Sequence, residues 1–211
     1  PRYDQLFEEP KIIMRQTADS IRCVYDESGY YVLNSILVFK KNSERYSYKY
    51  IAAVLNSTLT DYLYKKLTQE EGRTFAEVKP ANVRKLYIPK ATREEQDLLS
   101  ILYDYLVFLK NPNQTDSFVS LNSMFIDLFE KIIDGCVYEL LFREHMKERE
   151  IDIMSYLYQQ IKPIEGLSDQ DKNNIIISVH SNIFMTDNPA RARLKLFVSR
   201  SPEYLKPIIQ H

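Results

Sequence analysis

The 211-residue sequence contains only four glycines, three histidines and two cysteines, and their scarcity excludes several classes of functional site. The glycines, at positions 29, 72, 135 and 166, are too far apart to form a G-x-G-x-x-G turn or a P-loop. The histidines and cysteines do not have the spacing of zinc ligands. We therefore expect no catalytic residues, no metal site and no cofactor site in this segment.

Long apolar runs are also missing. No stretch approaches the roughly 18–20 residues that a membrane helix needs, and no secretory signal is present. Two cysteines, Cys23 and Cys136, are too few for the disulfide framework of a secreted fold. The sequence begins with Pro1 rather than Met. We therefore expect a piece of a longer cytoplasmic protein, without a membrane partner.

Charge divides the sequence into two regions. The hydrophobic content of 45% and the charged content of 27% are typical of a folded globular protein. Residues 1–93 hold 16 Lys and Arg against 11 Asp and Glu, whereas residues 94–211 hold 12 against 18. This asymmetry indicates an anionic partner for the first region and not for the second.

The basic region begins with three segments rich in Ile, Val and Tyr, which we expect to be strands: Lys11–Arg15, Ile21–Tyr25 and Tyr30–Lys40. The sequence "DESG" (26–29) predicts a hairpin turn between the second and third, with Gly29 at a positive φ. Helical periodicity follows, with Ser47 and Ser57 as N-caps of two helices. "KPANVRKLYIP" (79–89) predicts a short helix and then a short strand that ends at Pro89.

The acidic region is predicted to be entirely helical. "TREE" (92–95) is a capping box that opens a helix to about Lys110, and a second long helix spans about Phe118 to Phe142. Their apolar stripes and the short break between them predict an antiparallel helix hairpin. Further helices are expected over 151–161, after Ser168 and from Pro189. The overall prediction is an α+β fold: a strand-bearing core over 1–93, with a small mixed or antiparallel sheet, and a helical extension over 94–211.

Polar residues at the expected strand ends and loops of the basic region are of the types that contact DNA. Arg reaches guanine bidentately, Asn and Gln reach adenine, and Thr and Lys bind phosphates. The candidate DNA-binding residues are Arg15, Gln16, Thr17, Arg22, Asn34, Arg73, Thr74 and Lys79. The same pattern also fits the solvated rim of an ordinary α+β domain.

Two other functions stay open at this point. Asp61, Glu77 and Lys79 have the D…E-x-K order that nucleases place around a divalent metal, although Asp61 falls within a predicted helix. Alternatively, the acidic helix hairpin is a protein–protein interaction module without a DNA role.

An ordered set of motifs carries a family resemblance: "EEPKIIMRQTADSIRCVYDESGYYVLNSILVF", "YKYIAAVLNSTLTDYLYKKL" and "FAEVKPANVRKLYIPKATREEQ". Together they resemble the TaqI-like C-terminal specificity domain, the target-recognition part of adenine-specific DNA methyltransferases and of type II restriction–modification enzymes. The later "FEKIIDGCVYELLF" and "NPARARLKLFVSRSPEYLKPI" resemble the helical extension that follows this domain in many such proteins.

The resemblance implies a division of labour. A methyltransferase domain in the same polypeptide would bind S-adenosylmethionine and modify adenine at N6, in some relatives fused to a restriction endonuclease, whereas this segment would bind double-stranded DNA and read the target. It also implies that Arg15, the loop from Gln16 to Ser20, the loop from Arg73 to Phe75, and Lys79 approach the duplex. Family members often have a second basic residue after the first Arg, and here that residue is Gln16.

Overall fold

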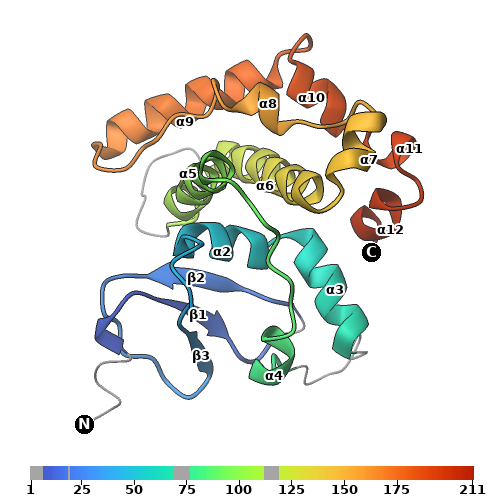
Figure 1. The fold of residues 1–211 in the computed structure, drawn as a ribbon. Helices are drawn as coiled ribbons and strands as arrows, with labels where there is room; N and C mark the ends of the chain where they lie inside the picture. Colours follow the sequence, from blue (N-terminus) through green and yellow to red (C-terminus); the bar gives the residue numbers. More distant parts are fainter. Residues whose placement is uncertain (1–6, 19, 69–76, 112–118) are drawn as a thin grey trace. The chain divides into compact units, whose positions relative to one another are not determined.

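The computed structural model describes residues 7–18, 20–68, 77–111 and 119–211, and it forms two compact units, residues 1–88 and 89–211 (Figure 1). The first unit combines a small sheet with helices and the second is helical, so the predicted α+β fold is confirmed. None of the helices that the structure describes is long and apolar enough to cross a membrane.

The sheet has three antiparallel strands in the order β2-β1-β3, with bounds β1 Lys11–Arg15, β2 Cys23–Asp26 and β3 Ile36–Phe39. Side chains alternate between its faces. Ile12 and Met14 of β1 are buried in the hydrophobic core, whereas Ile13 is only partly buried and Arg15 is exposed. We call the face that carries Ile13 and Arg15 the open face.

The predicted hairpin at residues 26–29 is wrong. Both β2 and β3 pair with β1, so they lie on opposite edges of the sheet and run in the same direction. The connection between them must therefore cross the sheet from one end to the other, which a tight turn cannot do. Gly29 nevertheless has the predicted positive φ, of 77°.

Three helices complete the first unit, and they contribute to the core on the face opposite the open face (Figure 1). They are α2 Tyr48–Leu55, α3 Thr58–Thr68 and α4 Pro80–Val83. The predicted caps are confirmed: the Ser47 hydroxyl accepts from Tyr50 N at 3.0 Å and the Ser57 hydroxyl accepts from Thr60 N at 3.3 Å. Leu55, Tyr64 and Val83 bring the helices into one cluster with Ile12 and Met14.

The strand predicted before Pro89 is wrong. Residues 84–89 follow α4 as turns and irregular backbone, although Leu86 and Ile88 still pack against the core of the first unit. The apolar residues of this segment therefore serve packing without a neighbouring strand to pair with.

The second unit begins with the predicted helix hairpin, formed by α5 Arg93–Leu109 and α6 Val119–Leu141. The capping box at Thr92 and Glu95 is present, as the sequence predicts. Arg143, just after α6, pairs with Glu95 at the start of α5, whereas Lys110, at the end of α5, pairs with Glu130 within α6. These pairs show that the two helices are antiparallel.

Shorter helices follow this hairpin along the chain. They are α7 Arg143–Glu148, α8 Met154–Leu157, α9 Asp169–Phe184, α10 Pro189–Leu194, α11 Phe197–Arg200 and α12 Leu205–Ile209. The starts predicted at Ser168 and Pro189 are confirmed. The helix predicted over 151–161 is reduced to the single turn of α8, whose first N–H groups are bound by the buried Glu139 carboxylate, 2.6 Å from Ile153 N and 2.9 Å from Met154 N.

Candidate functional site

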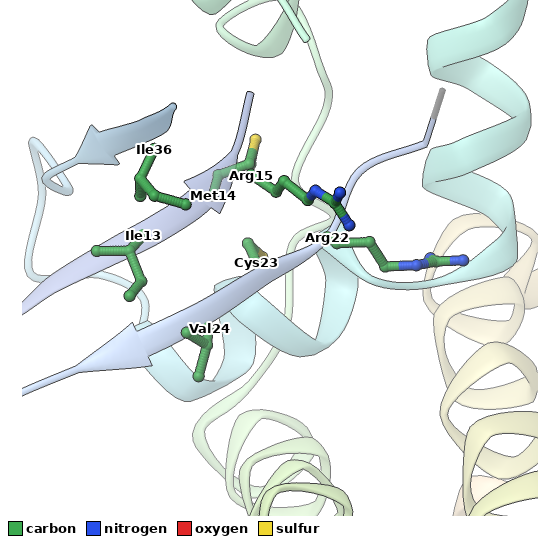
Figure 2. A pocket seen from close by; sticks show the side chains of 7 residues that line it. All are labelled: Ile13, Met14, Arg15, Arg22, Cys23, Val24 and Ile36. Atoms are coloured by element: carbon green, nitrogen blue, oxygen red, sulfur yellow. The ribbon is translucent and has the colours of Figure 1, made fainter. Parts of the chain in front are cut away.

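Two arginines lie directly opposite each other at one end of the open face. The β1–β2 register pairs Met14 with Cys23, and it continues through a hydrogen bond from Arg15 N to Arg22 O of 3.1 Å. Both side chains are exposed, and in Figure 2 they extend in the same direction, beyond the apolar residues of the strands. Like charges opposite each other in a sheet are destabilising, so this pair has a cost for the free fold.

No carboxylate in the described part of the chain forms an ion pair with Arg15 or Arg22. Arg22 donates from Nη1 to the Ile21 carbonyl oxygen at 3.2 Å, and a neutral carbonyl does not compensate its charge. A bound anion would remove the repulsion between the two guanidinium groups, because it attracts both. Among the described residues, the strand ends therefore present two cations without an opposing carboxylate.

A shallow pocket of about 300 Å³ adjoins the arginines on the open face (Figure 2). Its lining residues come from all three strands and from Arg22, which directly precedes β2: Ile13, Met14, Arg15, Arg22, Cys23, Val24 and Ile36. Burial raises the pKa of the Cys23 thiol to about 12, even though the neighbouring Arg22 lowers it. The pocket therefore offers apolar surface and two cations, without a reactive thiolate.

Gln16 and Thr17 continue β1 and meet the segment that leads into α4. Thr17 forms an isolated antiparallel bridge with Glu77, and Val78 N donates to Gln16 O at 2.7 Å. The Gln16 side-chain amide donates to the Glu77 carboxylate, which orients it. These contacts bring Lys79, exposed at the start of α4, to the same end of the sheet as Thr17.

Tyr64 of α3 fixes the position of that segment. Its hydroxyl lies 3.4 Å from Glu77 O, to which it donates, and accepts from Lys79 N at 3.2 Å. Because Tyr64 is buried in the core, the backbone around Lys79 is anchored to the helical side of the unit. This anchoring could not be foreseen from the sequence, where Tyr64 is one aromatic residue of a helical stripe.

Asn34 reaches the same end of the sheet from the β2–β3 connection. It lies in a turn closed by a hydrogen bond from Ile36 N to Leu33 O at 3.0 Å, and Gln16 N donates to Ser35 O at 2.9 Å. Asn34 is exposed. The structure thus gathers Arg15, Gln16, Thr17, Arg22, Asn34 and Lys79 at one end of the sheet, and the remaining candidates, Arg73 and Thr74, lie outside the described residues.

The opposite end of the open face holds a buried ion pair that sequence reasoning missed. Lys11 of β1 is fully buried and pairs with Asp26, its cross-strand partner in β2. Burial alone would raise the pKa of Asp26, but the hydrogen bond from Lys11 and the N–H groups of Ser28 and Tyr30 hold it below its ordinary value. Asp26 therefore fixes the start of the β2–β3 connection, at 3.0 Å from Ser28 N and 3.2 Å from Tyr30 N.

Two members of the alternative nuclease triad, Asp61 and Glu77, contact other residues. Asp61 pairs with Lys65 one turn later on α3, at 3.2 Å, and Glu77 accepts from Gln16. Within the described ranges, no three His, Cys, Asp or Glu side chains are grouped so that they could hold a metal ion.

The strand-bearing unit also matches a known family. Residues 1–88 match the TaqI-like C-terminal specificity domain. The match covers the first compact unit from end to end, and it stops where the second unit begins. Searches of curated proteins and of solved structures found no match.

The specificity-domain match indicates a DNA-recognition role of the kind that serves restriction–modification enzymes. It confirms the resemblance for the first unit, whereas the resemblance of residues 89–211 to a helical extension stays a prediction. The division of the chain into domains at residue 93 and the roles of individual site residues also stay predictions.

Proposed function

We propose that this chain recognises a double-stranded DNA target for a restriction–modification enzyme, with the Arg15 end of the sheet as its contact surface. The observation that carries the proposal is the exposed cross-strand pair Arg15 and Arg22, which lies on the matched domain and whose repulsion a phosphate would relieve. Phosphate contacts of this kind set the position of a protein on the duplex and give affinity without sequence preference.

Sequence preference would come from the amide and hydroxyl groups gathered around the arginines. Asn and Gln side chains pair with the adenine edge in the major groove, and Arg pairs with guanine, at about 1–3 kcal/mol of discrimination for each good bidentate contact. Gln16 is already oriented by Glu77, which reduces the conformational freedom that it loses on binding. Thr17 and Lys79 are suited to phosphate contacts.

The parent enzyme in this proposal is a DNA adenine-N6 methyltransferase, with or without a fused endonuclease, that acts in the cytoplasm. Its methyltransferase domain would bind S-adenosylmethionine and carry out the reaction, and the chain described here would supply target recognition. The family resemblance of the ordered motifs supports this assignment.

Binding of the 211-residue chain to fluorescent duplexes tests the proposal. We expect dissociation constants in the micromolar range or weaker, which rise with salt because phosphate contacts release counterions. Repeated selection from a random-sequence duplex pool should enrich a short common sequence. Binding that does not depend on salt, or no binding at low salt, would refute the proposal and favour a protein-interaction role for the helical region.

A further inference from the structure

The turn before β3 exposes large apolar side chains. Leu33 is 82% exposed, the highest value for any large apolar side chain in the described part of the chain, and Tyr30 and Tyr31 of the same connection are 66% and 64% exposed. Single exposed apolar residues are common, whereas here three lie within four residues of one connection. The sequence assigned these residues to a strand, where half of them would be covered.

The backbone of this connection is held in place on both sides of the exposed residues. Asp26 accepts hydrogen bonds from Ser28 N and Tyr30 N, and the Tyr31 ring stacks on Phe7 with centroids 5.0 Å apart. At the far end, Ile36 N donates to Leu33 O at 3.0 Å. Leu33 is therefore presented on an ordered turn, so its exposure is a property of the fold.

The positive charge close to the Leu33 turn indicates which kind of molecule would bind there. Gln16 N binds Ser35 O at 2.9 Å, and Ile36 pairs with Arg15 in the β1–β3 register. Leu33 thus lies at the same end of the sheet as the two arginines. An apolar tip beside two cations complements a polyanion with an apolar interior, and double-stranded DNA has phosphates outside and stacked bases inside.

We propose that Leu33 inserts between adjacent base pairs of the bound duplex and partly unstacks them, while Asn34 beside it faces the base edges. This inference rests on the proposed DNA-recognition function and adds Leu33, which is not among the DNA-binding residues predicted from the sequence. Leu is one of the side chains that proteins use as apolar wedges, and the unstacking is offset by contact of the wedge with the base faces.

The experiment uses the 211-residue chain and a duplex enriched by selection, with 2-aminopurine placed at successive positions. Because 2-aminopurine fluoresces more strongly when it is unstacked, wild-type binding should raise the signal at one step. Leu33→Ala should abolish that rise and weaken binding roughly tenfold, which is the order expected for losing the burial of a leucine side chain. Leu33→Met should retain the signal, because it keeps a long apolar side chain.

Leu63→Ala supplies the matched control, because Leu63 is an exposed leucine on α3, in the same unit. It should leave both the fluorescence and the affinity unchanged. Leu33→Ala should also leave the melting temperature unchanged, because the side chain makes little contact with the fold.

Three results would overturn the inference. An unchanged 2-aminopurine signal in Leu33→Ala would exclude a wedge, although salt-dependent binding would leave the proposed function standing. The wild-type chain could also lose as much affinity on a duplex with deoxyuridine in place of thymine as Leu33→Ala loses on the original duplex. That result would assign Leu33 to a contact with a thymine methyl group instead. Absence of binding by the wild-type chain to any duplex would refute the proposed function and, with it, the wedge.

Discussion

Arg15 and Arg22 provide the sharpest prediction, because the same two charges should oppose folding and favour binding. The perturbation is Arg22→Glu, with Arg22→Gln as the neutral variant. Arg22 lies opposite Arg15 across the β1–β2 pair, and both side chains are exposed. Substitution by Gln or Glu keeps part of the apolar stem that lines the pocket, which an alanine would remove.

The magnitude follows from Coulomb's law. Two unit charges about 6 Å apart in water repel by roughly 0.7 kcal/mol, and 0.15 M salt screens about half of this energy. Arg22→Gln should therefore raise the free energy of unfolding by about 0.3–0.7 kcal/mol, and Arg22→Glu, which turns repulsion into attraction, by about twice as much. Both variants should bind DNA more weakly, and Glu should be the weaker of the two.

Urea unfolding at low and high salt measures the first effect and fluorescence anisotropy with a labelled duplex measures the second. Arg93→Glu is a suitable comparison, because Arg93 is an exposed arginine of the second unit that already pairs with Asp97 at 3.1 Å. In the Arg15→Gln background the stabilising effect of Arg22→Gln should disappear. A fall in stability together with unchanged DNA affinity would refute the reasoning, because it would show that the pair serves the fold.

Three further predictions concern the framework around the site. Lys11→Met should destabilise the first unit by about 3–5 kcal/mol in urea unfolding, because it leaves the buried Asp26 unpaired, and adding Asp26→Asn should recover part of the loss; a loss below 1 kcal/mol would contradict the pair's role. Gly135→Ala should lower the melting temperature, because its Cβ would lie 2.6 Å from Ile153 Cδ1 and 3.0 Å from the Phe197 ring. An unchanged melting temperature would contradict this prediction and show that the side chains packed against Gly135 can shift to accept a methyl group. Burial lowers the pKa of His180, so the unfolded state binds its proton more readily and stability should fall as the pH drops below about 6.5; His180→Phe should reduce this dependence between pH 7 and pH 5, and an identical pH profile would refute it.

Local signals in the sequence were sufficient to predict the helix caps and the first strand. Ser47, Ser57 and Thr92 each cap a helix through a hydroxyl that reaches an N–H group within three residues. Such contacts depend on neighbours in sequence, so the residue types identify them. β1 was predicted with its observed bounds, because Lys11–Arg15 is a short run rich in Ile that is typical of a strand.

Strand pairing could not be predicted in the same way. Gly29 does adopt a positive φ, yet the turn it belongs to begins a connection across the sheet and does not join neighbouring strands. The choice of β1 as the central strand depends on contacts between distant residues, and the spacing of β2 and β3 along the sequence does not encode it. The apolar segment before Pro89 shows the same limit, since it packs on the core without pairing.

The candidate site was predicted as a set of residues without its geometry. Arg15 and Arg22 are of the expected type, but only the β1–β2 register places them opposite each other. Lys11 was expected to be an ordinary strand residue, and its burial against Asp26 arises from tertiary packing. Leu33 was missed because "YYVLN" has the composition of a covered strand, whereas the crossing connection leaves it exposed.

The salt dependence of duplex binding tests the central claim most directly. For the wild-type chain and for the Arg15→Gln, Arg22→Gln double variant, the logarithm of the association constant is measured against the logarithm of the salt concentration. If each arginine neutralises one phosphate, the slope of the double variant should be smaller in magnitude by about 1.8, since each phosphate contact contributes about 0.9. Equal slopes for the two proteins would contradict the assignment of this end of the sheet to DNA.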